Sequence, residues 1–241
     1  MSEGGRLLAL MPNSIWDSFR VIHPLLTIID PAAQVQMMAS LLDIYQHEGW
    51  LPDCHMSLCK GWTQGGSNAD VVLVDAYVKN VTSDIDWNLA LEAIINDAEN
   101  EPLEWSVHGR GGLQSWKVLN YIPYLDFDPY GFGTNSRSIS RTLEYSYNDF
   151  CLANLAQGLG KPDLYNKYIT RSTNWENLWR ADQKSIINGS DSGFTGFFQP
   201  KYQNRTWGYQ DPIACSALSS FCSLTSNPSE TFEASIWQYQ L

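Results

Sequence analysis

Three short segments of the sequence combine tryptophan with carboxylate and polar side chains. They are Trp16-Asp17-Ser18-Phe19-Arg20, the Gly-rich run from Gly61 to Asp70, and Glu233-Ala234-Ser235-Ile236-Trp237. An aromatic ring packs against the C–H face of a sugar, while carboxylates and amides exchange hydrogen bonds with sugar hydroxyls in fixed directions. Aromatic residues make up 13% of the chain, which is enough to form an aromatic surface of this kind. The three segments together indicate a carbohydrate ligand.

The first segment also has a structural explanation. Asp17 and Arg20 lie three positions apart, which on a helix brings them close enough for an ion pair. Trp16 in turn has the size and apolarity of a core residue. Both roles, sugar contact and structural element, remain open at this point.

The acidic residues of the later segments have similar explanations. Asp70 falls two residues into a predicted helix and Glu233 near the start of another, where a carboxylate interacts favourably with the helix dipole. Glu144 lies mid-helix, three residues after Arg141, a spacing that favours an ion pair on the helix face. The residues alone therefore support sugar binding and leave catalysis undecided.

The charge and hydropathy of the chain exclude some classes of partner. Its net charge is −11, from 15 Lys and Arg against 26 Asp and Glu, so we expect no nucleic-acid partner. No apolar run approaches the ~18 residues that would span a bilayer, so we expect no membrane span. The early apolar run Leu7–Met11 is shorter than the ~7–15 residues of a signal-peptide core, so we expect no signal peptide in this chain.

Three N-glycosylation sequons favour a secreted or secretory-pathway protein. They begin at Asn80, Asn188 and Asn204. In an oxidising compartment Cys215 and Cys222 are close enough in sequence to form a disulfide. The cysteines and histidines lack zinc-ligand spacing, so no zinc site is predicted.

The elements that must position these residues are predicted to be helices. Apolar residues recur at helical spacing, and Asp30-Pro31, Gly49 and Gly160 mark helix boundaries. Long irregular loops cover residues 50–68 and 100–134, and no repeat or linker divides the chain. We therefore predict a single all-α domain with helices over 15–29, 31–48, 69–78 with Asn68 as its cap, from Asp86 past Ile94, near Trp116, 138–159, 162–178 and from Glu233 to Leu241.

Six ordered blocks of the sequence resemble the catalytic domain of glycoside hydrolase family 92, the calcium-dependent exo-α-mannosidases, in a fungal-like version. The blocks extend over nearly the whole chain, which makes the resemblance specific. They are Ile15-Trp16-Asp17-Ser18-Phe19-Arg20, His23-Pro24-Leu25-Leu26-Thr27, Gly49-Trp50-Leu51-Pro52-Asp53, Gly65-Gly66-Ser67-Asn68-Ala69-Asp70, the run from Ser140 to Asp149, and Glu233-Ala234-Ser235-Ile236-Trp237-Gln238-Tyr239.

The resemblance implies a fold of helical hairpins arranged in a ring, an (α/α)6 toroid, which a β-sandwich domain precedes in the family. On this interpretation residues 1–241 form a single partial catalytic domain that holds about half of the hairpins. Residues 1–13 are then a non-matching N-terminal extension. The β-sandwich and the C-terminal half of the toroid are expected to be absent.

The resemblance also implies inverting hydrolysis of α-linked mannose, as an α-1,2-mannosidase acting on N-glycans or mannoprotein glycans. An inverting enzyme needs two carboxyl groups roughly 6.5–9.5 Å apart, one to protonate the leaving oxygen and one to activate water. Glu233 matches the position of the family's general acid. The general base belongs to an Asp-rich motif that follows well beyond this position, so we expect the chain to lack it.

The same resemblance assigns the binding residues and the cofactor. Asp17, Arg20 and Asp70 fall in blocks that line the sugar pocket, and Trp16 or Trp62 is expected at its wall, so these five residues are the expected contacts to an α-mannose-terminated glycan. Ca²⁺ is implied as a cofactor beside the sugar hydroxyls, and its ligands are not assigned to residues of this chain. The expected function is thus that of an exo-α-mannosidase fragment, inactive by itself. The alternatives are a non-catalytic mannose-binding remnant and a truncated gene product.

The sequence generates one direct prediction about activity. Because both carboxyl groups must flank the glycosidic bond, purified residues 1–241 should hydrolyse no α-mannoside above background, even with calcium. Release of mannose from an α-1,2-linked mannobiose measures this. Turnover that disappears in Glu233→Gln would contradict the prediction and place the base inside this chain.

Overall fold

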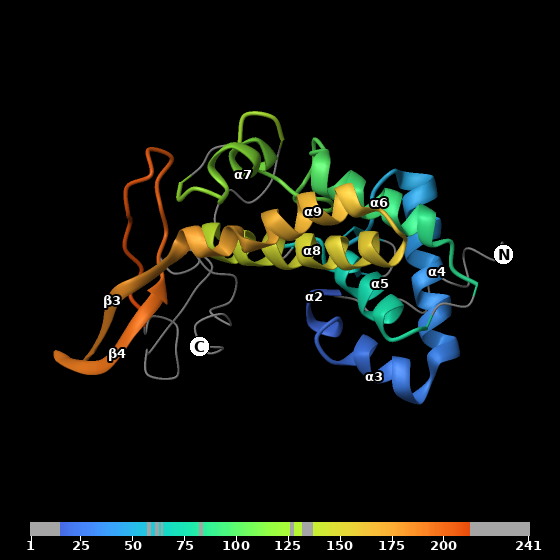
Figure 1. Ribbon diagram of the computed structural model, residues 1–241, viewed down its shortest axis with the longest axis horizontal. Helices are drawn as coiled ribbons and strands as arrows, with labels where there is room; N and C mark the ends of the chain where they lie inside the picture. The colour runs from blue at the N-terminus through green and yellow to red at the C-terminus, as the bar shows by residue number, and fades with distance from the viewer. Residues whose placement is uncertain are drawn as a thin grey trace.

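The computed structural model describes residues 15–56, 59–60, 63, 65–81, 84–125, 128–131 and 137–212 (Figure 1). Helices dominate these ranges. The helices are α2 (Ile15–Ser18), α3 (Ile22–Ile29), α4 (Pro31–Glu48), α5 (Asn68–Val78), α6 (Trp87–Glu99), α7 (Leu113–Leu119), α8 (Ser138–Gly158), α9 (Pro162–Arg171) and the 3-10 helix η2 (Ser172–Leu178). The strands are β1 (His55–Met56), β2 (Cys59–Lys60), β3 (Trp179–Ile187) and β4 (Ser190–Phe198), paired as two antiparallel hairpins.

Local signals set most helix ends where the sequence predicted them. The Asp30 side chain accepts from the backbone N–H of Ala33 at 3.1 Å, and Pro31 opens α4. α4 ends at Gly49, whose φ of 78° is a conformation that glycine adopts without strain. Asp86 caps α6 through the N–H groups of Asn88 and Leu89. These ends depend on short-range hydrogen bonds, which is why the sequence indicates them.

The core lies between α5, α8 and the helices around them. α5 is buried along nearly its whole length, and its Leu73 and the Leu152 of α8 have no exposed surface. Side chains of α4 and α6, such as Met38 and Ile94, complete the same apolar cluster. Because α5 is buried on every side, its short sequence reads as almost continuously apolar instead of amphipathic.

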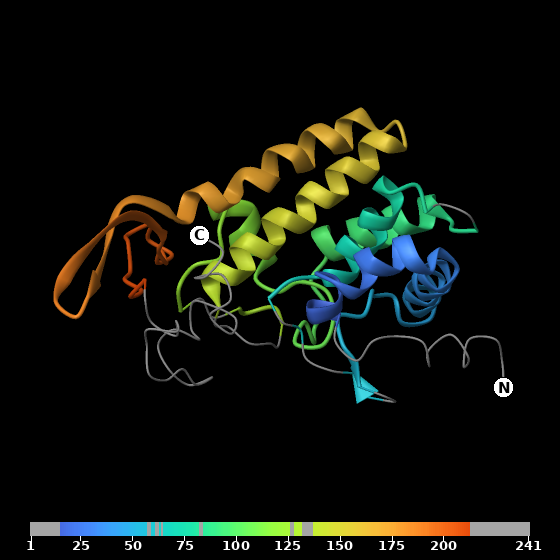
Figure 2. The same ribbon diagram turned by 90° about the horizontal axis from the view of Figure 1, so that it is seen from below.

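α8 and α9 form an antiparallel pair, which Figure 2 shows side by side along one edge of the molecule. Gly160, with a φ of 67°, and Pro162 at the start of α9 reverse the chain between them. The helix predicted over 162–178 is interrupted, because α9 ends at Arg171 and continues as the tighter helix η2. The described helices are thus consistent with helical hairpins, while the closed toroid stays a prediction.

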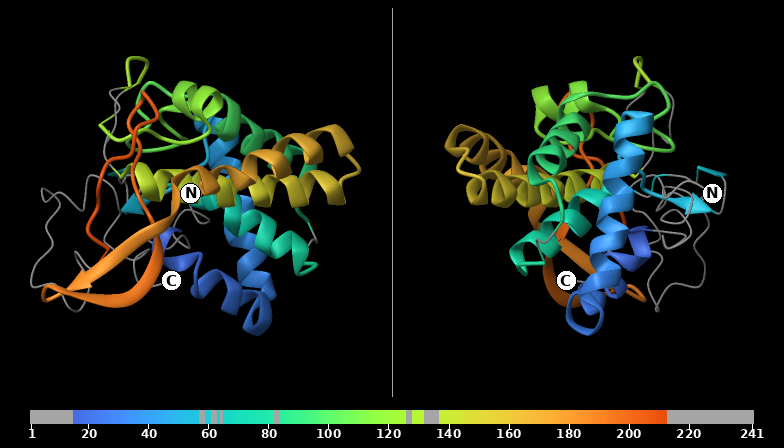
Figure 3. Two further views of the ribbon diagram at one scale, coloured as in Figure 1. Left: turned by 60° about the vertical axis from the view of Figure 1, so that its left-hand side comes forward. Right: turned by 90° about the vertical axis from the view of Figure 1, so that its right-hand side faces the viewer.

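The prediction of an all-α fold is wrong for residues 179–198, which form the hairpin β3–β4. This hairpin projects from the end of the α8–α9 pair (Figure 3). Its two-residue turn is Asn188-Gly189, with φ angles of 50° and 78°, the positive values that a hairpin turn requires. Asn-Gly is a strong hairpin signal, although Asn188 was predicted only as a glycosylation site. The shorter hairpin β1–β2 was likewise not predicted.

All three sequon asparagines are exposed in the folded chain. The side-chain oxygen of Asn204 accepts hydrogen bonds from the backbone and hydroxyl of Thr206, at 3.0 and 2.6 Å. Glycosylation at Asn80, Asn188 and Asn204 stays a prediction. The predicted disulfide partners Cys215 and Cys222 lie outside the described residues. Within the described ranges, none of the helices has the length and apolarity to cross a membrane.

The β3–β4 turn can be tested separately from the sequon that overlaps it. Gly189→Ala keeps the sequon but places a Cβ at positive φ, so it should destabilise the hairpin by about 1–2 kcal/mol. Amide hydrogen exchange over residues 179–198 measures this. Ser190→Ala is the matched control, because it removes the sequon and leaves the turn unchanged. Equal exchange in the two variants would contradict the assigned turn.

Candidate functional site

The first predicted sugar-binding segment folds into α2 and the turn that follows it. The backbone N–H of Ile15 donates to the Asp53 carbonyl at 3.2 Å, which ties the start of α2 to the loop after α4. Trp16 is buried, whereas Asp17 is exposed to solvent. The segment therefore presents one solvent-facing carboxylate above a buried indole ring.

Arg20 joins this segment to α8, 124 residues further along the chain. Its Nη2 donates to Oε1 of Glu144 at 3.0 Å, and its guanidinium lies 5.1 Å from the ring centre of Trp16 and 4.4 Å from that of Phe19. The sequence spacing had favoured a surface pair between Glu144 and Arg141, but the structure directs Glu144 into the interior towards Arg20. Two of the predicted contacts, Trp16 and Arg20, are thus brought together.

Glu144 is fully buried and tightly enclosed. Burial raises the pKa of its carboxyl to about 7; Arg20 opposes this shift and Asp53 adds to it. On the other side, a Cβ added at Gly66 would lie only 2.7 Å from the Glu144 Cβ. Position 66 must therefore be glycine for the loop before α5 to approach α8 this closely.

The amide of Asn148 and the carboxylate of Asp53 hold that loop in place. Asn148, one turn after Glu144, accepts from the Ser67 N–H at 3.1 Å and donates to the Ser67 carbonyl at 2.9 Å. Asp53 accepts from both the backbone and the side chain of Asn68, at 3.1 and 2.7 Å. Asn68, expected to cap α5, is its first residue and binds Asp53 instead. The Gly65–Asn68 loop, α2 and α8 thus meet at one rigid junction.

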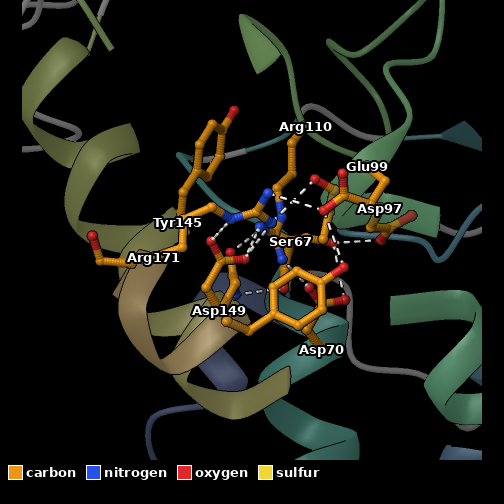
Figure 4. A network of polar contacts seen from close by, with 12 residues as sticks. Ser67, Asp70, Asp97, Glu99, Arg110, Tyr145, Asp149 and Arg171 are labelled. Carbon is orange, nitrogen blue, oxygen red and sulfur yellow. Dashed lines mark hydrogen bonds and ion pairs between the residues drawn. The ribbon is translucent and has the colours of Figure 1, made fainter. Parts of the chain in front are cut away.

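Asp70, another predicted sugar contact, lies beneath this junction in a buried network of charged residues (Figure 4). Its Oδ2 accepts from Arg110 Nη2 at 2.8 Å, and Nη1 of the same guanidinium donates to Asp149 of α8 at 2.8 Å. The side chains of all three residues are fully buried. Burial lowers the pKa of Arg110, but Asp149 and Asp70 outweigh it, so the guanidinium stays charged.

Asp97 of α6 enters the network through Ser67. The Ser67 hydroxyl lies 2.6 Å from Oδ2 of Asp97 and 3.3 Å from Oδ1 of Asp70. Burial, together with the nearby charge of Asp70, raises the pKa of Asp97 well above its usual value. A neutral Asp97 can donate to Ser67, which in turn donates to Asp70. Burial also raises the pKa of Asp70, to about 7, although Arg110 and Ser67 oppose this shift. Asp97, whose pKa is raised well above its usual value, therefore holds the proton, and Asp70 is the ionised partner of Arg110.

Arg171, at the end of α9, extends the network towards the surface. Its guanidinium forms a two-pronged ion pair with Asp149, and its Nη1 donates to Glu99 of α6 at 3.0 Å. Burial alone raises the pKa of Glu99, but Arg171, Lys167 and Lys117 together lower it to about 2. The charges therefore alternate in sign and join α5, α6, α8 and α9.

The structure separates some of the predicted site residues. Asp17 is exposed, whereas Asp70 has no exposed surface, so the two do not line one open pocket. The hydroxyl contact assigned to Asp70 by resemblance stays a prediction, and its observed role is in the ion-pair network. Trp62 and Glu233 lie outside the described residues.

A cavity of about 520 Å³ opens beside Arg20. The stacked rings of Tyr147 and Phe150 line it on α8, and Trp175 lines it from η2. Its volume lies in the range of small-molecule sites, and all three rings are partly exposed. The cavity combines aromatic surface with one cationic side chain, which suits a polyhydroxylated ligand better than a metal ion.

The described residues do not by themselves fit a calcium site. Over these ranges, no group of three or more Asp, Glu, His or Cys side chains gathers to hold a metal ion. The calcium implied by the resemblance stays a prediction without assigned ligands.

Sequence reasoning missed several polar residues of this region. Arg110 lies in the run Gly109-Arg110-Gly111-Gly112, and a lone arginine among glycines was a usable signal of a buried cation. Asp97 and Asp149 gave no signal, because isolated acids on helices are usually solvated. Only their tertiary contacts show what they do.

Comparison with known proteins gives one consistent result. The family model of the glycosyl hydrolase family 92 catalytic domain matches residues 7–241. An uncharacterized secreted glycosidase of Arthroderma benhamiae is 64% identical over 200 residues, which cover 83% of this chain and 26% of that protein.

Solved structures agree. The family GH92 inverting mannosidase of Bacteroides thetaiotaomicron superposes with a TM-score of 0.70 and 29% identity, over 82% of this chain and 24% of that one. A family GH92 α-mannosidase of the same organism, in complex with mannoimidazole, gives a TM-score of 0.65 and 26% identity, over 80% and 22%. The chain thus spans about a quarter of the length of the relatives it matches.

The protonation states assigned to the network generate a stability prediction. Asp97→Asn should change the free energy of unfolding by less than about 1 kcal/mol near pH 4, where Asp97 is neutral in the folded state and largely neutral in the unfolded state, and the variant should be the more stable of the two at pH 7. Asp149→Asn should cost about 3–5 kcal/mol, because it leaves buried arginines uncompensated. Urea unfolding followed by circular dichroism measures both.

The pH dependence provides the control. A raised pKa in the folded state means that folding takes up a proton, so the stabilisation from Asp97 is complete at low pH and declines as pH rises towards the folded pKa. Asp97→Asn should therefore lose less stability than the wild type between pH 5 and 8. An Asp97→Asn variant as unstable as Asp149→Asn at pH 7 would show that Asp97 is ionised.

Proposed function

Because the chain belongs to glycosyl hydrolase family 92, we propose that it forms part of the mannose site of an inverting exo-α-mannosidase. The structural relatives support this, since one is an inverting mannosidase and another binds mannoimidazole. The chain spans about a quarter of their length. The proposed activity is accordingly that of the complete catalytic domain to which these residues contribute.

The observation that carries the proposal is the convergence of Trp16 and Arg20 beside an aromatic cavity. The Arg20 guanidinium contacts both Trp16 and Glu144 and lines the cavity of about 520 Å³. Such a wall supplies apolar surface for sugar C–H groups and fixed donors for sugar hydroxyls. The position of Asp17 on the same turn adds an exposed acceptor.

Each residue then has a distinct part in the proposed reaction. Arg20 and Asp17 bind hydroxyls and fix the orientation of the terminal mannose, which lowers the entropic part of the barrier. Glu233, from the resemblance, donates the proton to the leaving oxygen, and a carboxylate from the remainder of the catalytic domain activates water on the opposite face. Asp70 holds α5 against α8 through Arg110, and α8 carries Tyr147 and Phe150 of the cavity.

The proposed substrates are α-mannose-terminated glycans, in particular α-1,2-linked ones, of N-glycans or mannoproteins. The similarity to a secreted glycosidase and three exposed sequons support a secreted location. Calcium is the proposed cofactor of the complete domain, in which it would supply positive charge next to sugar hydroxyls.

Hydrolysis of α-1,2-mannobiose by the mannosidase that carries these residues tests the proposal. Asp17→Asn should lower kcat/KM about 10–100-fold, because a charge-assisted hydrogen bond is worth about 1.5–3 kcal/mol. Asp43→Asn, on the surface of α4, is the matched control and should retain activity. Proton NMR of the fresh product should show β-mannose first, as inversion requires.

Two results would contradict this assignment. If α-mannose is released first, the reaction is retaining and the inverting mechanism is wrong. If the wild type binds mannose but releases none from any α-mannoside, the chain belongs to a binding protein instead of an enzyme.

A further inference from the structure

Glu144 is a buried acid whose position is fixed from three directions. Its side chain has no exposed surface, and one carboxylate oxygen, Oε1, binds Arg20 at 3.0 Å. Gly66 packs directly against its Cβ. Asn148, one turn further along α8, holds the same loop by its backbone. The carboxylate therefore cannot move aside without breaking the junction between α2, α8 and the loop before α5.

The second carboxylate oxygen faces a donor that is also unsatisfied. Glu144 Oε2 and Trp16 Nε1 are both buried without a hydrogen-bond partner. The indole N–H of Trp16 lies close enough to this carboxyl to be among the groups that lower the pKa of Glu144. Two unsatisfied groups facing each other in a dry interior attract strongly, so a small displacement of either closes a hydrogen bond.

Arg20 transmits this fixed position to the cavity. It is partly exposed, with 22% of its side chain accessible, whereas Glu144 is fully enclosed. The rings of Trp16 and Phe19 flank the guanidinium and leave it few alternative orientations. A long arginine in a turn would otherwise sample many rotamers. Its contact with Glu144 selects the one that lines the cavity.

We propose that Glu144 is a positioning residue of the mannose site, which holds Arg20 and Trp16 in the orientation that binds the sugar without touching the sugar itself. This inference rests on the proposed function. It assigns to a mid-helix acid, which sequence spacing places on the helix surface, a part in substrate affinity. Because Glu144 acts on the bound ground state through Arg20, its loss should raise KM more than it lowers kcat.

The groups that face Glu144 also determine how the contact responds to pH. They are Arg20 from the turn after α2, Asp53 from the loop after α4, and Tyr147 on α8 itself. With a pKa of about 7, the carboxyl is ionised above neutrality and pairs fully with Arg20; below it, only a neutral hydrogen bond remains. KM should therefore rise as pH falls below 7, and Glu144→Gln should remove this part of the pH dependence.

A double-mutant cycle in the mannosidase that carries these residues tests the proposal. Glu144→Gln keeps the shape of the side chain and should raise KM for α-1,2-mannobiose about tenfold, with kcat within about threefold. In an Arg20→Ala background the same substitution should change KM less than about twofold, because its partner is already gone. Glu92→Gln, an exposed acid on α6, is the matched control.

A second measurement needs no turnover. The indole ¹⁵N–¹H signal of Trp16 should shift with a midpoint near pH 7 in the wild-type chain and lose that transition in Glu144→Gln. Equal KM effects of Glu144→Gln with and without Arg20, or a Trp16 signal that does not titrate, would overturn the positioning role while leaving the mannosidase assignment intact. A wild type that neither binds nor cleaves α-mannosides would overturn the proposed function and this inference together, even with a titrating indole.

Discussion

The packing of the described helices depends on the guanidinium of Arg110, which lies between Asp70 of α5 and Asp149 of α8 with no exposed surface. Removing one partner from such a group leaves a buried charge uncompensated, at a cost of about 3–5 kcal/mol. The relative position of α5 and α8 is therefore tightly constrained, because both carboxylates must reach one guanidinium. Arg171 adds α9 to the same frame, and Ser67 adds the loop that precedes α5.

The helix boundaries could be predicted because they depend on neighbours in sequence. Asp30 and Asp86 accept hydrogen bonds from N–H groups two or three residues away, and Gly49 supplies the positive φ that ends α4. The β3–β4 hairpin was missed although its signal is equally local. The residues Asn188-Gly189-Ser190 fit both a hairpin turn and a sequon. Only the folded structure shows that the turn is formed.

The candidate site could be predicted only in part, because its contacts join distant segments. Family blocks located Trp16 and Arg20, and the structure brings them together. The spacing of Glu144 from Arg141 favoured a surface pair, yet the partner is Arg20, 124 positions away. Asp70 has the helix-start position that a favourable dipole explains, but its main contact is Arg110. Helical spacing constrains neighbours on one helix and carries no information about partners across the core.

The two buried charge systems differ in what they can do. Arg110 and its carboxylates have no exposed surface, and the contacts observed for them hold the helices together as a frame. Arg20 and Glu144 lie at the edge of that frame, with the acid enclosed and the arginine partly exposed beside a cavity. A pair with one partner fixed and one accessible transmits the rigidity of the core to a ligand. Asp149 and Glu144 both lie on α8. The buried ion pairs of Arg110 therefore fix the helix that carries Glu144, and this in turn fixes the position of Arg20.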